Sequence, residues 1–96
     1  MRITVLPAAR DDLRDIWRFG ARMWGEVQAD RYSDVLNAAI EGLGVHPFMG
    51  PTAAEVCPGL RRLVVRSHVV FYRVEAEVLR VVRVLHGSRD AGRWAG

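Results

Sequence analysis

The chain has 96 residues, of which 50% are hydrophobic and 26% charged, and its formal net charge is +3. This length accommodates one hydrophobic core, so we expect a single domain over residues 1–96. All 14 basic residues are arginine, which excludes any reaction that needs a lysine as a general base, a Schiff-base amine or a phosphate ligand.

Cysteine and histidine usage argues against a metal centre. Cys57 is the only cysteine, so no internal disulfide forms. The three histidines lie far apart in sequence, with no acidic residue at metal-ligand spacing beside them. No apolar run approaches the roughly 20 residues of a membrane span, and the N-terminal segment becomes charged too early for a signal peptide. We therefore expect a cytoplasmic protein with no metal, no cofactor and no membrane partner.

The N-terminal half reads as a strand followed by two helices. Residues 2–6 are β-branched and end at Pro7, which suits the first turn of a helix. Apolar residues then recur at helical spacing up to Trp24, and Gly25 breaks the pattern. A second apolar seam predicts a helix over residues 26–43, ended by the glycines and proline that follow. The short break predicts an antiparallel helical hairpin.

The C-terminal half reads as a loop followed by three strands. Residues 44–59 hold three of the four prolines, and this composition predicts a loop. The β-rich runs at 60–66, 69–74 and 78–86 are joined by two or three residues, so they form consecutive antiparallel hairpins.

The element order is therefore strand, helix, helix, strand, strand, strand. It predicts an α+β fold, in which the helical hairpin packs on one face of a small, mainly antiparallel sheet. The other face of the sheet is expected to be less covered.

Arginines are dense in the predicted strands. One interpretation is a concave positive surface for an acidic peptide or for RNA phosphate. The other is a set of solvent-facing residues whose stems cover apolar surface. Strand parity does not show which of them share a face, so both stay open. The six are Arg61, Arg62, Arg66, Arg73, Arg80 and Arg83.

His86 ends the last predicted strand, where a histidine near arginines is either a general acid or base or a packing residue. His68, in the turn before the middle strand, is more typical of a structural residue.

Motifs along nearly the whole chain resemble the ParE toxins of bacterial type II toxin–antitoxin modules. The match runs from about residue 3 to residue 90 and rests on the order and spacing of several short pieces. In the N-terminal half these are Asp12-Leu13-x-x-Ile16-Trp17, Trp24-Gly25-x-x-Gln28-Ala29-x-x-Tyr32 and His46-Pro47-x-x-Gly50. In the C-terminal half they are Pro58-Gly59-Leu60-Arg61-Arg62, Ser67-His68-Val69-Val70-Phe71-Tyr72-Arg73-Val74 and Arg83-Val84-Leu85-His86.

The resemblance implies a RelE/ParE-type fold and a protein that inhibits DNA gyrase without a catalytic site of its own. It also implies a ParD-like antitoxin whose C-terminal segment wraps over the toxin in a hetero-oligomer. Two alternatives stay open. One is a RelE-like, ribosome-dependent mRNA endonuclease, whose reduced site would be Arg66, Arg83 and His86. The other is a non-toxic relative that only binds its antitoxin.

Two sets of contact residues follow as expectations. Charge and a flat aromatic surface suit an acidic amphipathic segment, and a tryptophan flanked by arginines suits a target contact. No sequence-specific nucleic-acid binding is expected, because a charge of +3 is small. For antitoxin docking the set is Arg61, Arg62, Arg66, Tyr72 and Arg83, and for target binding it is Arg89, Arg93 and Trp94.

Overall fold

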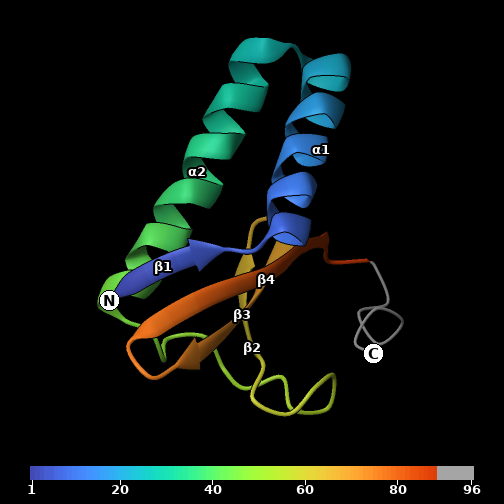
Figure 1. The fold of residues 1–96 in the computed structure, drawn as a ribbon. Coiled ribbons are helices and arrows are strands. Elements are labelled where there is room, and N and C mark those ends of the chain that lie inside the picture. The colour runs from blue at the N-terminus through green and yellow to red at the C-terminus, as the bar shows by residue number, and fades with distance from the viewer. Residues whose placement is uncertain (89–96) are drawn as a thin grey trace.

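A computed structural model describes residues 1–88 and contains all six predicted elements in the predicted order (Figure 1). Five of the six begin and end within one residue of the ranges predicted from the sequence. The bounds are β1 (Arg2–Val5), α1 (Pro7–Trp24), α2 (Glu26–Val45), β2 (Arg61–Val65), β3 (His68–Glu75) and β4 (Val78–His86).

The strands form one mixed sheet in the order β1-β4-β3-β2. β3 is antiparallel to both β2 and β4, whereas β1 runs parallel to β4 at the other edge. The two helices lie on one face of this sheet, and the tip of their hairpin projects away from it (Figure 1). The predicted α+β class, with a helical hairpin on a mainly antiparallel sheet, is confirmed.

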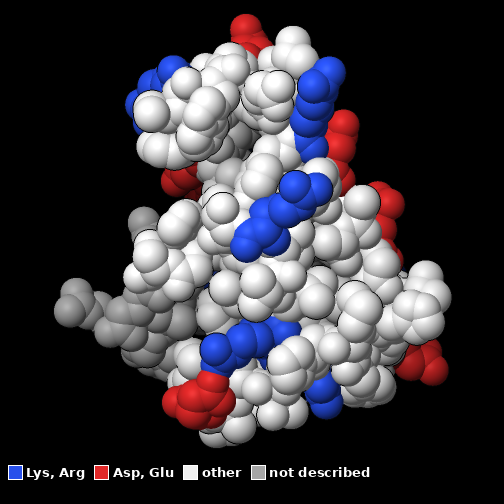
Figure 2. Space-filling view, turned by 180° about the vertical axis from the view of Figure 1, so that it is seen from behind, with Lys and Arg blue, Asp and Glu red and all other residues white. Residues whose placement is uncertain are grey.

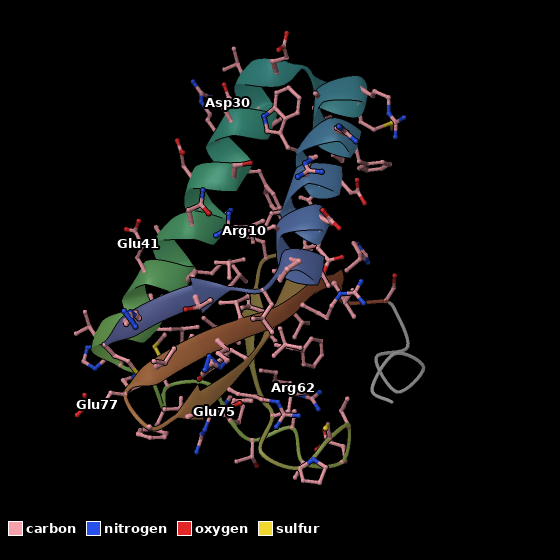
Figure 3. All side chains as sticks on the ribbon, viewed as in Figure 1. Arg10, Asp30, Glu41, Arg62, Glu75 and Glu77 are labelled. Atoms are coloured by element: carbon pink, nitrogen blue, oxygen red, sulfur yellow. The ribbon has the colours of Figure 1, made fainter. Side chains whose placement is uncertain are left out.

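Gly25 joins α1 and α2 with a φ of 89°, a left-handed conformation that glycine adopts without steric cost. Near the tip, Gly20 packs against Ala29, where an added Cβ would lie 3.5 Å from the alanine Cβ. The indole Nε1 of Trp17 donates a hydrogen bond to Asp30 Oδ1 at 2.8 Å, and Asp30 lies on the side of α2 that faces α1 (Figure 3). Small residues and this bond hold the helices close together.

α2 continues to Val45, two residues beyond the predicted end, so the expectation that Gly42 and Gly44 end the helix is wrong. A Cβ on Gly44 would meet the Ile3 side chain at 3.1 Å and the Met1 carbonyl oxygen at 3.2 Å. The glycine therefore serves close packing of α2 on β1, and does not act as a helix terminator there.

The main core lies between the helices and the sheet. Leu36, Ile40 and Leu43 of α2 meet the side chains that β3 and β4 present to the helices, including Val70 and Leu79. Tyr72 also lies in this core and is 0% exposed.

A second, smaller core covers the opposite face of the sheet. Ala53 and Leu60 from the loop after α2 pack on Phe71 and Leu85. This face is less covered than the helical one, as expected, but it is not open, because residues 51–60 fold back over part of it. The loop also pairs with the outer edge of β2, through Arg62 N–H to the Pro51 carbonyl at 3.0 Å.

Three of the strand arginines fasten this loop. Arg61 donates to the Gly50 carbonyl at 2.8 Å, and Arg62 forms an ion pair with Glu55 (Figure 3). Arg73 donates to the Pro58 carbonyl at 2.7 Å and to Cys57 Sγ at 2.9 Å.

At the other edge of the sheet, Arg10 Nε donates to the Val5 carbonyl at 3.1 Å.

One partly buried ion pair ties α1 to β4. Arg83 Nε and Nη2 donate to the two carboxylate oxygens of Asp12 at 2.7 and 2.8 Å. Asp12 Oδ2 also accepts the Val84 backbone N–H at 2.9 Å. The Asp12 side chain is only 12% exposed, and the bond to Asp12 raises the pKa of Arg83, so the guanidinium stays charged. Charged bidentate bonds of this kind are both strong and directional.

Asp12→Ala is expected to lower the free energy of unfolding by about 2–4 kcal/mol, because it leaves the Arg83 charge and the Val84 N–H without this acceptor. Urea denaturation measures the change. Asp11→Ala is the matched control, since the Asp11–Arg14 pair is exposed, and its removal should cost less than about 0.5 kcal/mol. Equal losses in the two variants would contradict the role given to Asp12.

Candidate interaction surface

A groove of about 600 Å3 lies between the helical hairpin, the β2–β3 turn and the end of β4. Ile16, Phe19 and Trp24 of α1 and Tyr32 and Val35 of α2 give it an apolar wall. Arg31 of α2 also lines it, and the sheet contributes Arg66, Ser67 and His86. Within the described residues no aspartate or glutamate lines the groove. Such a surface suits an amphipathic segment with acidic side chains.

The apolar part of the groove continues onto the hairpin tip. Phe19 and Trp24 form an edge-to-face pair with ring centroids 5.8 Å apart, yet they are 51% and 65% exposed. Met23 and Val27 beside them are also exposed. Contiguous exposed apolar side chains on a small domain indicate an interaction site. Helical spacing leaves Trp24 as either a core residue or an exposed contact at the hairpin tip beside Gly25, and the structure shows that it is exposed.

Arg66 occupies the β2–β3 turn with a φ of 56°. This left-handed conformation favours glycine or asparagine, and an arginine there costs roughly 1 kcal/mol or more. The side chain is exposed, and within residues 1–88 no ion pair joins it to a carboxylate. Ala76 has a similar φ of 53° in the β3–β4 turn, so this conformation belongs to the two-residue hairpin turns.

Two histidines and a tyrosine lie where the groove meets the sheet. His68 and His86 face each other across β3 and β4, with ring centroids 5.4 Å apart. Tyr32 Oη lies 2.6 Å from His68 Nδ1, which connects α2 to the sheet. Burial lowers the pKa of His68, and the nearby His86 lowers it further.

The predicted docking arginines do not form one surface. Arg61 and Arg62 hold the loop on the far face of the sheet, and Arg83 is bound by Asp12. Only Arg66 lines the groove. Figure 2 shows basic side chains spaced down the rear face, from the helical hairpin to the sheet, with acidic side chains mainly at its margins.

The prediction that Tyr72 offers a flat aromatic surface to a partner is wrong. The ring is 0% exposed in the main core, and its hydroxyl accepts the Gly50 N–H at 3.0 Å. Tyr72 thus anchors the loop from inside the protein.

The residues considered for a nuclease site are also divided. Arg66 and His86 line the groove, whereas Arg83 is bound to Asp12. The predicted target-binding residues Arg89, Arg93 and Trp94 lie outside the described residues.

Residues 1–88 contain no group of three or more histidine, cysteine, aspartate or glutamate side chains placed to hold a metal ion. None of the helices in this range is long and apolar enough to span a membrane.

The fold is a small α+β domain that also occurs in a solved toxin–antitoxin structure. A solved structure of the chromosomal ParDE toxin–antitoxin system from P. aeruginosa superposes with a TM-score of 0.81, over 90% of this chain and 95% of that chain, at 18% sequence identity. That likeness shows the fold.

Sequence comparison then gives the family. The family model of the ParE toxin of the type II toxin–antitoxin system parDE matches residues 3–91. Toxin ParE1 of Caulobacter vibrioides is 45% identical over 88 residues, which cover 92% of this chain and 91% of that protein. Toxin ParE1 of Mycobacterium tuberculosis is 40% identical over 93 residues, which cover 96% and 95%. The chain belongs to the ParE toxin family, and the resemblance seen in its motifs is confirmed.

The lowered pKa of His68 predicts acid sensitivity. The folded protein binds a proton at His68 less readily than the unfolded chain, so the free energy of unfolding should fall as pH drops below about 6.5, the ordinary histidine value. His68→Gln should reduce the slope of the free energy of unfolding against pH, measured by urea denaturation from pH 7.5 to 5.0. His46→Gln, in the exposed loop, is the control and should leave the slope unchanged. An unchanged slope in His68→Gln would refute the assignment.

Proposed function

We propose that this ParE toxin inhibits DNA gyrase and is neutralised by a ParD-like antitoxin that binds in the groove. Membership of the ParE family is the observation that carries the proposal, since it comes from the whole length of the chain. Gyrase acts in the cytoplasm, and this is also the compartment in which the single Cys57 stays reduced.

The groove supports an antitoxin segment as the occupant. Its apolar wall suits the buried face of an amphipathic helix, and Arg31 and Arg66 suit acidic residues on that helix. The domain is small, so the burial supplied by a bound partner would add to its stability. Toxin and antitoxin would then exist as a hetero-oligomer until the antitoxin is removed.

The geometry favours inhibition by binding over the nuclease alternative. A ribonuclease site needs basic groups that converge on one phosphate. Arg83 instead donates two hydrogen bonds to Asp12 of α1. Arg66 and His86 remain in the groove, beside an apolar wall that suits a protein segment better than RNA.

The purified toxin is expected to stop supercoiling of relaxed plasmid by gyrase and to produce linear, cleaved DNA. Prior addition of a ParD-like antitoxin should restore supercoiling. A reconstituted translation reaction is the control, and it should continue at its normal rate. Translation arrest with ribosome-dependent mRNA cleavage, together with normal gyrase activity, would replace this proposal with the nuclease function.

Removal of residues 89–96 is expected to abolish gyrase inhibition, because Arg89, Arg93 and Trp94 have the composition of an interface hot spot. Affinity for the antitoxin should stay within about twofold, since all the groove-lining residues that the structure describes come before this segment. Trp94→Ala separates the indole from the arginines. Full inhibition by the truncated protein would refute the assignment, and a large fall in its melting temperature would assign the segment to stability instead.

A further inference from the structure

The sheet end of the groove differs chemically from its helical wall. Phe19 and Trp24 make one end apolar, whereas Arg66 and His86 bring hydrogen-bond donors to the other. A segment lying along the groove would therefore contact apolar side chains at the helical end and the polar side chains of Arg66 and His86 at the sheet end.

Arg66 and His86 belong to one rigid unit. The Gly87 backbone N–H donates to the Ser67 carbonyl at 2.8 Å, which ties the end of β4 to the turn that carries Arg66. His68, directly after the turn, pairs with His86 across the two strands. These backbone contacts therefore keep the turn that carries Arg66 next to the end of β4 that carries His86.

His86 is oriented as a donor toward its surroundings. Its Nδ1 accepts the Ser88 backbone N–H at 3.1 Å and lies 2.7 Å from Ser88 Oγ. In the neutral ring the proton therefore sits on Nε2. The side chain is exposed, so Nε2–H is accessible to an acceptor in the groove.

We propose that Arg66 and His86 form a carboxylate-binding subsite that receives one acidic side chain of the antitoxin segment. The subsite rests on the proposed function, because it needs an antitoxin in the groove. Charge complementarity identifies the occupant, since no acidic side chain lines the groove and Arg66 has no carboxylate partner within residues 1–88. Arg66 supplies the planar fork that carboxylates prefer, and His86 supplies a second donor.

The incoming carboxylate would accept hydrogen bonds from the Arg66 guanidinium and from His86 Nε2–H, while His86 Nδ1 keeps its bond from the Ser88 N–H. The other charged or titratable groups around His86 are Asp12, Asp15 and Arg22 on α1, Arg31 and Tyr32 on α2, and Arg66 on the turn.

The test measures affinity for the full-length antitoxin by calorimetry at pH 7.5. Arg66→Gln should weaken binding by about tenfold or more, because it removes the charged donor. His86→Gln should weaken binding by about threefold to tenfold, because it removes the second donor. Arg18→Gln and His46→Gln are matched controls outside the groove and should behave as wild type.

A second variant at Arg66 distinguishes a loss of antitoxin binding from a loss of stability. Arg66→Gly removes the side chain and relieves the left-handed backbone, so its melting temperature should equal or exceed that of wild type while its affinity falls as in Arg66→Gln. If Arg66→Gly, Arg66→Gln and His86→Gln all keep wild-type affinity, the subsite is refuted and the antitoxin still binds. If wild-type toxin does not bind the antitoxin at all, the proposed function itself is refuted.

Discussion

The ion pair between Asp12 and Arg83 is the constraint on which the position of the helical hairpin depends. It joins the first turns of α1 to the far half of β4, and the same carboxylate accepts the Val84 N–H. β4 is central in the sheet, between β1 and β3, so this one carboxylate sets the helices relative to all four strands. The groove depends on that setting, because its walls come from both helices and from the β2–β3 turn.

The arginines divide into two roles that charge alone does not distinguish. Arg61, Arg62 and Arg73 bind carbonyls, a carboxylate and the Cys57 sulfur of the loop after α2, and so act as structural fasteners. Arg66 lies at the groove with its backbone in an unfavourable conformation. The net charge of +3 therefore does not show where on the surface positive charge is available to a partner.

Periodicity predicted the element order and most element bounds, because the helical seams and the β-rich runs are local signals. Side-chain direction in the sheet was not predictable in this way. Phe71 pairs with Arg83 but Tyr72 pairs with Val81, so Val82 is an extra residue that shifts the alternation along β4. Contacts of long sequence separation, such as Arg73 with Pro58 and Tyr72 with Gly50, depend on how the loop folds back, and no local pattern encodes them. Helical spacing alone also did not show that Phe19 and Trp24 are exposed, because it does not show where the hairpin extends beyond the sheet.

Both edges of the sheet are partly covered by other parts of the chain, and this cover limits self-association. At β2, backbone pairing with residues 51–53 occupies the outer groups of residues 60–62, and at β1 the Arg10 side chain occupies the Val5 carbonyl. Open edges invite strand addition by other copies and lead to aggregation. A toxin released from its antitoxin must remain dispersed long enough to meet its target, and these two caps serve solubility during that interval.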